Sequence, residues 1–123
     1  KPLGRIVSWA TVGVDPALMG MGPAPAIRKA LERAQLTLAD LDLIEINEAF
    51  AQVVIQSMRD LKVDESIVNV NGGAIALGHP IGMSGNRLAL TLLHELRRRG
   101  GGVGAAALCG GGGQGDAIVL RTR

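Results

Sequence analysis

Short apolar runs alternate along the chain with three longer stretches in which apolar side chains recur every three or four positions. The short runs predict β-strands, and the longer stretches predict amphipathic α-helices. The predicted strands cover residues 5–14, 41–46, 67–70, 102–108 and 117–120. The predicted helices run from Pro23 or Pro25 to about Gln35, from Glu48 or Ala49 to about Lys62, and from Ser84 to about Gly100. The element order is therefore β-α-β-α-β-α-β-β.

This order is that of an α/β domain with a mixed five-stranded sheet, and it brings reactive side chains to one edge of the sheet. Strands joined by helical crossovers run parallel, so their carboxyl ends share an edge, and ligand sites in such sheets lie there. Asn47 follows the second predicted strand, His79 lies in the loop beyond the third, and Cys109 ends the fourth. We therefore expect these three side chains to converge.

Polar residues predict where two helical segments begin. Thr37 and Asp40 have the spacing of a capping box, which predicts a single short helical turn. Ser84 stands at the start of the third helical stretch, where a serine side chain can accept a hydrogen bond from a free N–H group of the first turn. We expect Ser84 to be the N-cap of that helix.

Composition narrows the class of protein. A chain of 123 residues with 47% hydrophobic residues has the length and the apolar content of one domain. The net charge of +2 is small, and Arg97–Arg99 at a predicted helix end supply much of the basic surplus. With no Tyr, one Trp and one Phe, the chain has little on which bases could stack, so we expect no nucleic-acid partner.

Residues 66–86 contain no Asp, Glu, Lys or Arg, which raises the question of a membrane span. Asn69, Asn71, the pair Gly72–Gly73 and the pair His79–Pro80 would break or desolvate a spanning helix. We therefore expect this segment to be buried in protein, and we expect no membrane partner.

The N-terminus has neither a signal-peptide pattern nor a start methionine, and it is interpreted as a cut inside a longer chain.

The single cysteine, Cys109, excludes an intramolecular disulfide and a multi-cysteine metal site. It fits a reducing compartment, so we expect a cytoplasmic location.

Two glycine-rich segments have the spacing of known nucleotide-binding motifs, but the residues around them exclude both motifs. Gly110–Gly115 has the spacing of a dinucleotide-binding turn, but the chain stops eight residues later. Gly73–Gly78 has the spacing of a P-loop, but His79–Pro80 stands where Lys and Ser or Thr are needed.

Cys109 and His79 each have a structural interpretation beside the chemical one. A lone cysteine is more often a small buried hydrophobe than a catalyst, and a lone histidine is as easily a hydrogen-bonded loop residue as a base. Together at one sheet edge, and flanked by glycines, they would supply a thiol, a proton acceptor and exposed amide donors. His94 lies near a charged helix end, which favours a surface position. Met19 can either fill a core gap or line an apolar ligand channel.

Three segments resemble the signature blocks of the thiolases, which comprise the acetyl-CoA acetyltransferases and the 3-ketoacyl-CoA thiolases. The segments are Asn47–Phe50 (NEAF), residues 69–87 (NVNGGAIALGHPIGMSGNR) and Cys109–Gly115 (CGGGGQG). The resemblance corresponds to the C-terminal half of a thiolase subunit. It implies that residues 1–123 form a thiolase-like half, with the N-terminal domain absent. It also implies an acyltransferase that condenses or cleaves CoA thioesters by reversible Claisen chemistry in fatty acid metabolism.

The resemblance further implies roles for four residues. His79 would activate the acyl-accepting cysteine of the N-terminal half, and would donate to the thioester oxygen of acetyl-CoA together with a water held by Asn47. Cys109 would remove a proton from the methyl group of acetyl-CoA and return a proton in thiolysis. The backbone amide of Gly111 would point into the oxyanion hole of the acyl-enzyme.

Ligands and partners are implied in the same way. Phe50 and Met19 match positions near the pantetheine and acyl end of the ligand. Acyl-CoA and acetyl-CoA would be substrates, with no held cofactor and no metal. The N-terminal thiolase domain would be a necessary partner, because Cys109 is the only cysteine here and the chain alone would be inactive. Complete subunits would form homodimers or tetramers. Gly110 stands where many relatives carry an aliphatic residue, a departure that affects local rigidity.

Two other interpretations stay open. The chain could be a non-catalytic thiolase-like module that binds acyl-CoA or a partner subunit, and a cysteine in the right loop of the N-terminal half would favour the enzyme instead. A decarboxylating condensing enzyme is the other alternative. Those enzymes usually pair two histidines, or a histidine and an asparagine, with one cysteine, whereas Cys109 stands where they place one of those residues.

Overall fold

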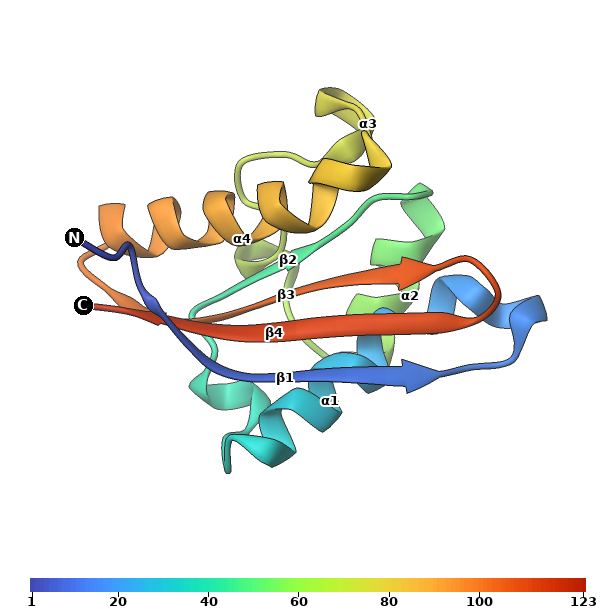
Figure 1. Cartoon of the computed structure of the whole chain (residues 1–123), viewed down its shortest axis with the longest axis horizontal. Helices are drawn as coiled ribbons and strands as arrows, with labels where there is room; N and C mark the ends of the chain where they lie inside the picture. The colour runs from blue at the N-terminus through green and yellow to red at the C-terminus, as the bar shows by residue number, and fades with distance from the viewer.

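A computed structural model describes residues 1–123 (Figure 1). The strands are β1 (Arg5–Gly13), β2 (Leu43–Ile46), β3 (Gly102–Gly110) and β4 (Gln114–Thr122). The helices are α1 (Pro23–Arg33), α2 (Ala51–Leu61), the short α3 (Ala74–Leu77) and α4 (Ile81–Arg98). Short 3₁₀ turns are η1 (Pro16–Met21), η2 (Leu38–Asp40) and η3 (Glu65–Ile67). The predicted α/β class and the order of its elements are confirmed, with the exception of the third predicted strand.

The strands form one mixed sheet in the order β1-β4-β3-β2. β2 runs parallel to β3, with Ile46 opposite Ala107, and β4 is antiparallel to both β1 and β3. β1, β2 and β3 therefore point the same way, and their carboxyl ends share one edge of the sheet. The turn from β3 to β4 lies at this edge, and the two chain termini lie at the opposite end (Figure 1).

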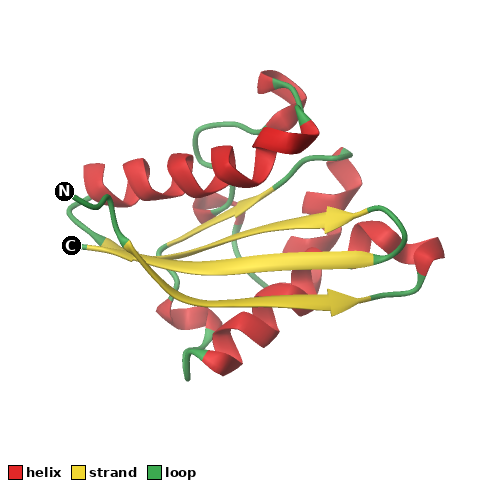
Figure 2. Cartoon of the chain, viewed as in Figure 1, coloured by secondary structure: helices red, strands yellow, loops and turns green.

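Helices cover both faces of the sheet (Figure 2). Along β3, Ala105 and Ala107 belong to a large buried cluster with residues of α1 and α2, whereas Ala106 belongs to a smaller cluster with residues of α4. Because side chains alternate along a strand, α1 and α2 pack on one face and α4 on the other. A Cβ at Gly104 would lie 2.6 Å from Leu92 Cδ1 of α4. The small residues of β3 therefore let α4 come close to the sheet.

The sheet has four strands instead of the five predicted, because residues 67–70 form only one isolated bridge, between Val68 and Ile44. At Asn69 the chain adopts a φ of 47°, in the left-handed region. The Asn69 side chain then makes the hydrogen bonds to β2 that a neighbouring strand would otherwise make. Its Oδ1 accepts from the Ile46 N–H at 2.8 Å, and its Nδ2 donates to the Ile46 carbonyl at 2.9 Å. The side-chain amide of Asn69 therefore provides hydrogen-bond partners for the N–H and the carbonyl of Ile46 on the outer edge of β2.

Helix α4 begins earlier than predicted. Its N-cap is Pro80, and Ser84 already lies inside the helix, so the prediction of Ser84 as N-cap was wrong. Ser84 Oγ instead donates to the Pro80 carbonyl at 3.1 Å, a local bond that serine can form within a helix. The capping box is confirmed, because the Thr37 N–H donates to Asp40 Oδ2 at 2.7 Å at the start of η2.

The uncharged segment 66–86 is largely exposed within this chain, which corrects the expectation that it is buried in protein. Ile75, Leu77 and Ile81 are 68%, 62% and 85% exposed. They stand on α3 and at the start of α4, which project from the rest of the domain (Figure 1). The reason is that no other element of the 123 residues packs over them. No helix of the chain is both long enough and apolar enough to cross a membrane.

A buried ion pair fixes α4 to β2. Arg87 Nη1 donates to Glu45 Oε2 at 3.1 Å, and Glu45 is 2% exposed. Burial raises the pKa of Glu45 to about 7, although the nearby Arg87 cation opposes the rise. The second terminal nitrogen of Arg87, Nη2, is buried without a hydrogen-bond partner. The pair therefore sets the register of α4 on β2 while both groups carry a desolvation penalty.

Removing the Asn69 amide should destabilise the fold. Asn69→Gly keeps the positive φ accessible but leaves the N–H and carbonyl of Ile46 without partners, so we expect the free energy of unfolding to fall by about 2 kcal/mol. Urea denaturation measures this change. Asn86→Ala, at an exposed position of α4, is the matched control and should change stability by less than about 0.5 kcal/mol. Equal values for the two variants would contradict the role given to the Asn69 side chain.

Breaking the ion pair should give a loss of stability that depends on pH. The pKa of Glu45 is about 7 in the folded chain against an ordinary value of 4.5, so the folded state binds more protons in this window and stability falls as the pH rises through it. Arg87→Met removes the compensating cation. We expect a loss of about 3 kcal/mol at about pH 8, and a smaller loss at about pH 5, where Glu45 is neutral.

Denaturant titrations at the two pH values provide the measurement. The double variant Glu45→Met/Arg87→Met removes both charges and should return to within about 1 kcal/mol of the parent chain at either pH. A loss for Arg87→Met that is the same at both pH values would show that Glu45 does not change its charge between them.

Candidate functional site

Asn47 lies where β2 ends at the carboxyl edge. Its backbone N–H donates to the Ala107 carbonyl at 2.9 Å, which extends the parallel pairing with β3 by one residue. The residue is 1% exposed, and its side chain lies against the His79 ring, with Nδ2 at 3.3 Å from Nε2 and at 3.5 Å from Nδ1. Asn47 Oδ1 is buried without a hydrogen-bond partner. The structure therefore brings Asn47 and His79 together from distant parts of the chain.

His79 lies in the loop between α3 and α4, and α4 supplies its second contact. The Nδ1 atom of His79 is 2.6 Å from Ser84 Oγ. Ser84 is 1% exposed, whereas His79 is an exposed residue. The imidazole is thus held by Asn47 and Ser84 and stays accessible on its remaining side.

Glu48, the residue after Asn47, ties the loop that carries His79 to the sheet. The Glu48 carboxylate accepts from the Ile75 N–H at the start of α3 at 2.9 Å. Gly73 makes this approach possible, because a Cβ at that position would overlap the Glu48 carboxylate. The same segment that provides Asn47 therefore also fixes the loop that presents His79.

Cys109 lies one residue before the end of β3, opposite Gly115 of β4. It is half-buried and packs against the large cluster on the α1 and α2 face, because it shares the alternation of Ala105 and Ala107 along β3. Burial raises the pKa of its thiol. Cys109 shares the sheet edge with Asn47 and His79, but no hydrogen bond joins its thiol to either of them. The expected convergence of three side chains is therefore a contact between two, with the third at the same edge.

The glycines after Cys109 serve two different purposes. Gly113 has a φ of 90° and lies against the Val14 carbonyl, and Gly115 lies against the backbone of Gly22, so a Cβ at either position would overlap main-chain atoms. Gly111 is exposed with open space around it, and its N–H donates to no acceptor in the chain. The Gly111 amide is therefore free to donate to an oxygen from outside.

Met19 and Phe50, which the resemblance places near the ligand, line one surface groove. The groove has a volume of about 460 Å³ and lies between η1 and the first turn of α2. Phe50 is 66% exposed, and Met19 is half-buried. Because η1 follows β1 and α2 follows β2, the groove opens at the same carboxyl edge as Asn47.

Two residues of this site were not found by sequence reasoning. Ser84 was assigned to helix capping, although it is the only hydroxyl residue between Pro80 and Leu90 and follows His79 closely. Glu48 was not singled out, because its contact with the loop depends on a glycine far along the chain. His94 is exposed on α4, in agreement with its predicted surface position.

These groups can transfer protons and stabilise a negatively charged oxygen. His79 offers an imidazole with one open side, and Cys109 offers a thiol at the same edge. The Asn47 amide and the free Gly111 N–H are neutral polar groups of the kind that stabilise an oxyanion. The chemistry that fits this set is acyl transfer with proton transfer.

Residues 1–122 match the protein family described as thiolase, C-terminal domain. The chain is 62% identical over 122 residues to an acetyl-CoA acetyltransferase of Shinella zoogloeoides, an alignment that covers 99% of this chain and 31% of the relative. It is 54% identical over 121 residues to the mitochondrial 3-ketoacyl-CoA thiolase of Homo sapiens, covering 98% of this chain and 30% of the relative.

Solved structures share the fold. The human mitochondrial 3-ketoacyl-CoA thiolase in complex with CoA matches with a TM-score of 0.97 at 53% identity, over 100% of this chain and 31% of that one. The Bacillus anthracis acetyl-CoA acetyltransferase matches with a TM-score of 0.95 at 52% identity, over 98% and 31%. The chain thus spans about a third of the length of the relatives that it matches. By the extent of the family match and these identities, the chain belongs to the thiolase family, as a thiolase C-terminal domain.

Proposed function

We propose that this domain works within a complete subunit that transfers acyl groups between CoA thioesters by reversible Claisen condensation and thiolysis. The observation that carries the proposal is the contact of Asn47 with His79 at the sheet edge that also holds Cys109 and Gly111, in a chain of the thiolase family. Two relatives bear the names acetyl-CoA acetyltransferase and 3-ketoacyl-CoA thiolase. In this proposal acyl-CoA and acetyl-CoA are substrates, and neither a held cofactor nor a metal takes part.

His79 is the base that takes the proton from an acyl-accepting cysteine supplied by the N-terminal half. Its ring is held by Asn47 and Ser84 and is open elsewhere, so a thiol can approach it without displacing a side chain of this domain. The thiolate then attacks the acyl-CoA thioester, the thioester C–S bond breaks, and the CoA thiolate that leaves takes the proton of the Cys109 thiol, while His79 keeps the proton that it accepted. In the condensation step His79 donates to the thioester oxygen of acetyl-CoA, together with a water held by the Asn47 amide.

Cys109 transfers the second proton. Its thiolate removes a proton from the methyl group of acetyl-CoA, and the carbon nucleophile that forms attacks the acyl-enzyme. The bond between the acyl carbon and the acyl-accepting cysteine breaks, and the thiolate of that cysteine takes back the proton held by His79. In thiolysis the Cys109 thiol returns its proton to the methyl carbon. Two thiols divide the work, because one must be acylated while the other must stay free. Burial raises the pKa of the Cys109 thiol, because desolvation disfavours the thiolate. The Gly111 N–H donates to the thioester oxygen of the acyl-enzyme.

The pantetheine arm of the substrate occupies the groove beside Met19 and Phe50. Six of the nine residues that line this groove are hydrophobic, which suits the apolar parts of the arm. The unbranched Met19 side chain can adjust to the ligand, and the exposed Phe50 ring gives it a flat surface.

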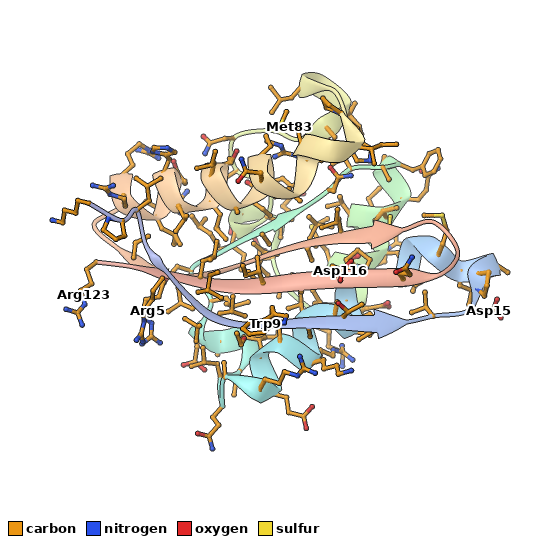
Figure 3. The ribbon with its side chains drawn as sticks, in the orientation of Figure 1. Arg5, Trp9, Asp15, Met83, Asp116 and Arg123 are labelled. Carbon is orange, nitrogen blue, oxygen red and sulfur yellow. The ribbon has the colours of Figure 1, made fainter.

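The N-terminal half of the subunit covers the apolar side chains that this domain leaves exposed. Ile75, Leu77, Ile81 and Met83 follow one another along α3 and the first turn of α4, and all are large and exposed. Trp9 of β1, 66% exposed, borders a smaller groove of about 210 Å³ beside α4. Figure 3 labels Met83 and Trp9 at these two places. Contiguous apolar surface marks an interface, and the relatives are about three times as long as this chain.

Complete subunits are proposed to form homodimers or tetramers in the cytoplasm and to serve fatty acid metabolism. The names of relatives point to more than one location, since an acetyl-CoA acetyltransferase of Mus musculus is called cytosolic and the human 3-ketoacyl-CoA thiolase is called mitochondrial. Light scattering of the complete subunit and fractionation of its host cells test these two parts of the proposal.

The 123-residue chain by itself should not cleave acetoacetyl-CoA. Its only cysteine, Cys109, has the proton-transfer role, so no thiol is left to accept the acyl group. The measurement is CoA-dependent loss of acetoacetyl-CoA absorbance with the purified chain, and we expect no rate above background. Turnover by the chain alone would show that Cys109 can itself be acylated.

Substitutions in the complete subunit should separate the two half-reactions. Cys109→Ala should still form the acyl-enzyme, seen as a mass increase of the intact protein, but should condense at least about 100-fold more slowly. His79→Ala should impair both steps, because the same imidazole serves both. His94→Ala, at an exposed position of α4, is the matched control and should leave both rates unchanged.

Loss of acylation in Cys109→Ala as severe as the loss of condensation would refute the role assigned to Cys109. A complete subunit that binds acyl-CoA but forms no acyl-enzyme would instead identify a non-catalytic thiolase-like module.

A further inference from the structure

Ser84 contacts the histidine that the proposed function uses, yet none of the roles above belongs to it. It is 1% exposed and lies near the start of α4. Its Oγ is 2.6 Å from His79 Nδ1 and 3.1 Å from the Pro80 carbonyl oxygen. Because the side chain is buried, these two groups are the partners that satisfy its hydroxyl.

These two contacts decide which ring nitrogen of His79 carries the proton. A hydroxyl has one hydrogen to donate and lone pairs with which to accept, whereas a carbonyl oxygen can only accept. The Ser84 hydrogen therefore goes to the Pro80 carbonyl, and Ser84 Oγ accepts from His79. The neutral imidazole then carries its proton on Nδ1 and keeps a free lone pair on Nε2.

Asn47 restrains the ring without selecting its tautomer. Its Nδ2 lies at nearly equal distances from the two ring nitrogens, 3.3 Å from Nε2 and 3.5 Å from Nδ1. An atom in the ring plane at these two distances would clash with the ring carbon between the nitrogens, so Nδ2 lies out of that plane. The Nε2 lone pair, which lies in the plane, therefore stays open, and the choice of tautomer belongs to Ser84.

We propose that Ser84 is a positioning residue that holds His79 in the tautomer with its proton on Nδ1 and so presents the Nε2 lone pair to the reacting thiol. The proposal rests on the proposed function for the role of His79 as base, whereas the tautomer itself can be tested without any activity. A base accepts a proton only through a lone pair, and an imidazole in the other tautomer presents an N–H there instead.

The position of Ser84 in α4 makes it a rigid support. Its bond to the Pro80 carbonyl fixes the serine side chain in one orientation. Arg87 lies one turn further along the same helix, and its ion pair with Glu45 holds the helix on β2. The Ser84 oxygen therefore keeps its place when substrate or a thiol presses on the ring of His79.

The tautomer can be measured by ¹⁵N NMR of histidine-labelled protein. The chain has two histidines, so His94→Gln leaves the signals of His79 alone. We expect Nδ1 to give the shift of a protonated nitrogen and Nε2 that of an unprotonated one, at a pH where the ring is neutral. Ser84→Ala should move both shifts toward the values of a tautomer mixture.

Ser57→Ala is the matched control. Ser57 lies on α2, is also 1% exposed, and its hydroxyl has no hydrogen-bond partner, so the variant removes the same atom from an equally buried site. It should leave both shifts of His79 unchanged. A proton on Nε2 in the parent chain, or unchanged shifts in Ser84→Ala, would overturn the proposal. The parent spectrum decides the question even if a variant does not fold.

Kinetics of the complete subunit provide a second readout. Ser84→Ala should lower kcat for acylation roughly 10- to 100-fold with little change in KM, because the ring is present but misdirected. Ser84→Thr keeps the hydroxyl and should recover most of the rate, and Ser57→Ala should not change it. A rise in KM with an unchanged kcat would assign Ser84 to substrate binding and overturn the positioning role.

The two readouts separate this inference from the proposed function. An inactive parent subunit whose His79 carries its proton on Nδ1 would refute the function and leave the tautomer standing. An active subunit whose His79 carries its proton on Nε2 would support the function and refute the role of Ser84.

Discussion

The close approach of α4 to β2 and β3 is the constraint on which the rest of the structure depends. β3 permits it because Gly104 lies under Leu92, where a Cβ would overlap the leucine side chain. Apolar contact alone would let the helix slide along the sheet, since burial of apolar surface has no direction. The ion pair between Arg87 and Glu45 removes that freedom, because its hydrogen bond has a fixed geometry. The start of α4 is thereby brought to the carboxyl end of β2.

Polar contacts at the carboxyl end of β2 hold the His79 ring in one orientation relative to α4 and the sheet. Asn47 at the end of β2 and Ser84 on α4 each contact a ring nitrogen of His79, so the ring is oriented by two elements whose relative position is already set. The loop between them is held in the same manner, by the Asn69 amide on the edge of β2 and by the Glu48 carboxylate on the N–H of α3. The polar contacts that place the imidazole are therefore directional.

The order of the elements and the approach of Asn47 to His79 could be predicted from the sequence, because periodicity and crossover geometry are local properties of the chain. The fifth strand could not be predicted correctly, since Asn69 replaces a strand with its side chain and residue type does not reveal that pairing. Ser84 has the residue type of an N-cap, but whether a serine caps or back-bonds depends on where the helix starts. The exposure of Ile75 shows a similar limit: an apolar stretch indicates that something covers it, and does not indicate what.

The placement of Cys109 determines where the proposed reaction can occur. Its thiol packs on the α1 and α2 face, while Asn47 and His79 meet beside α4 on the other face, so the two groups have no common pocket inside the layers of the domain. They share only the edge of the sheet, where the Gly111 N–H and the open side of the imidazole are also exposed. A thioester that exchanges protons with both must therefore lie beyond that edge. In the complete subunit proposed here, the N-terminal half that covers α3 and the start of α4 would enclose this thioester, so the proposed reaction would depend on both halves.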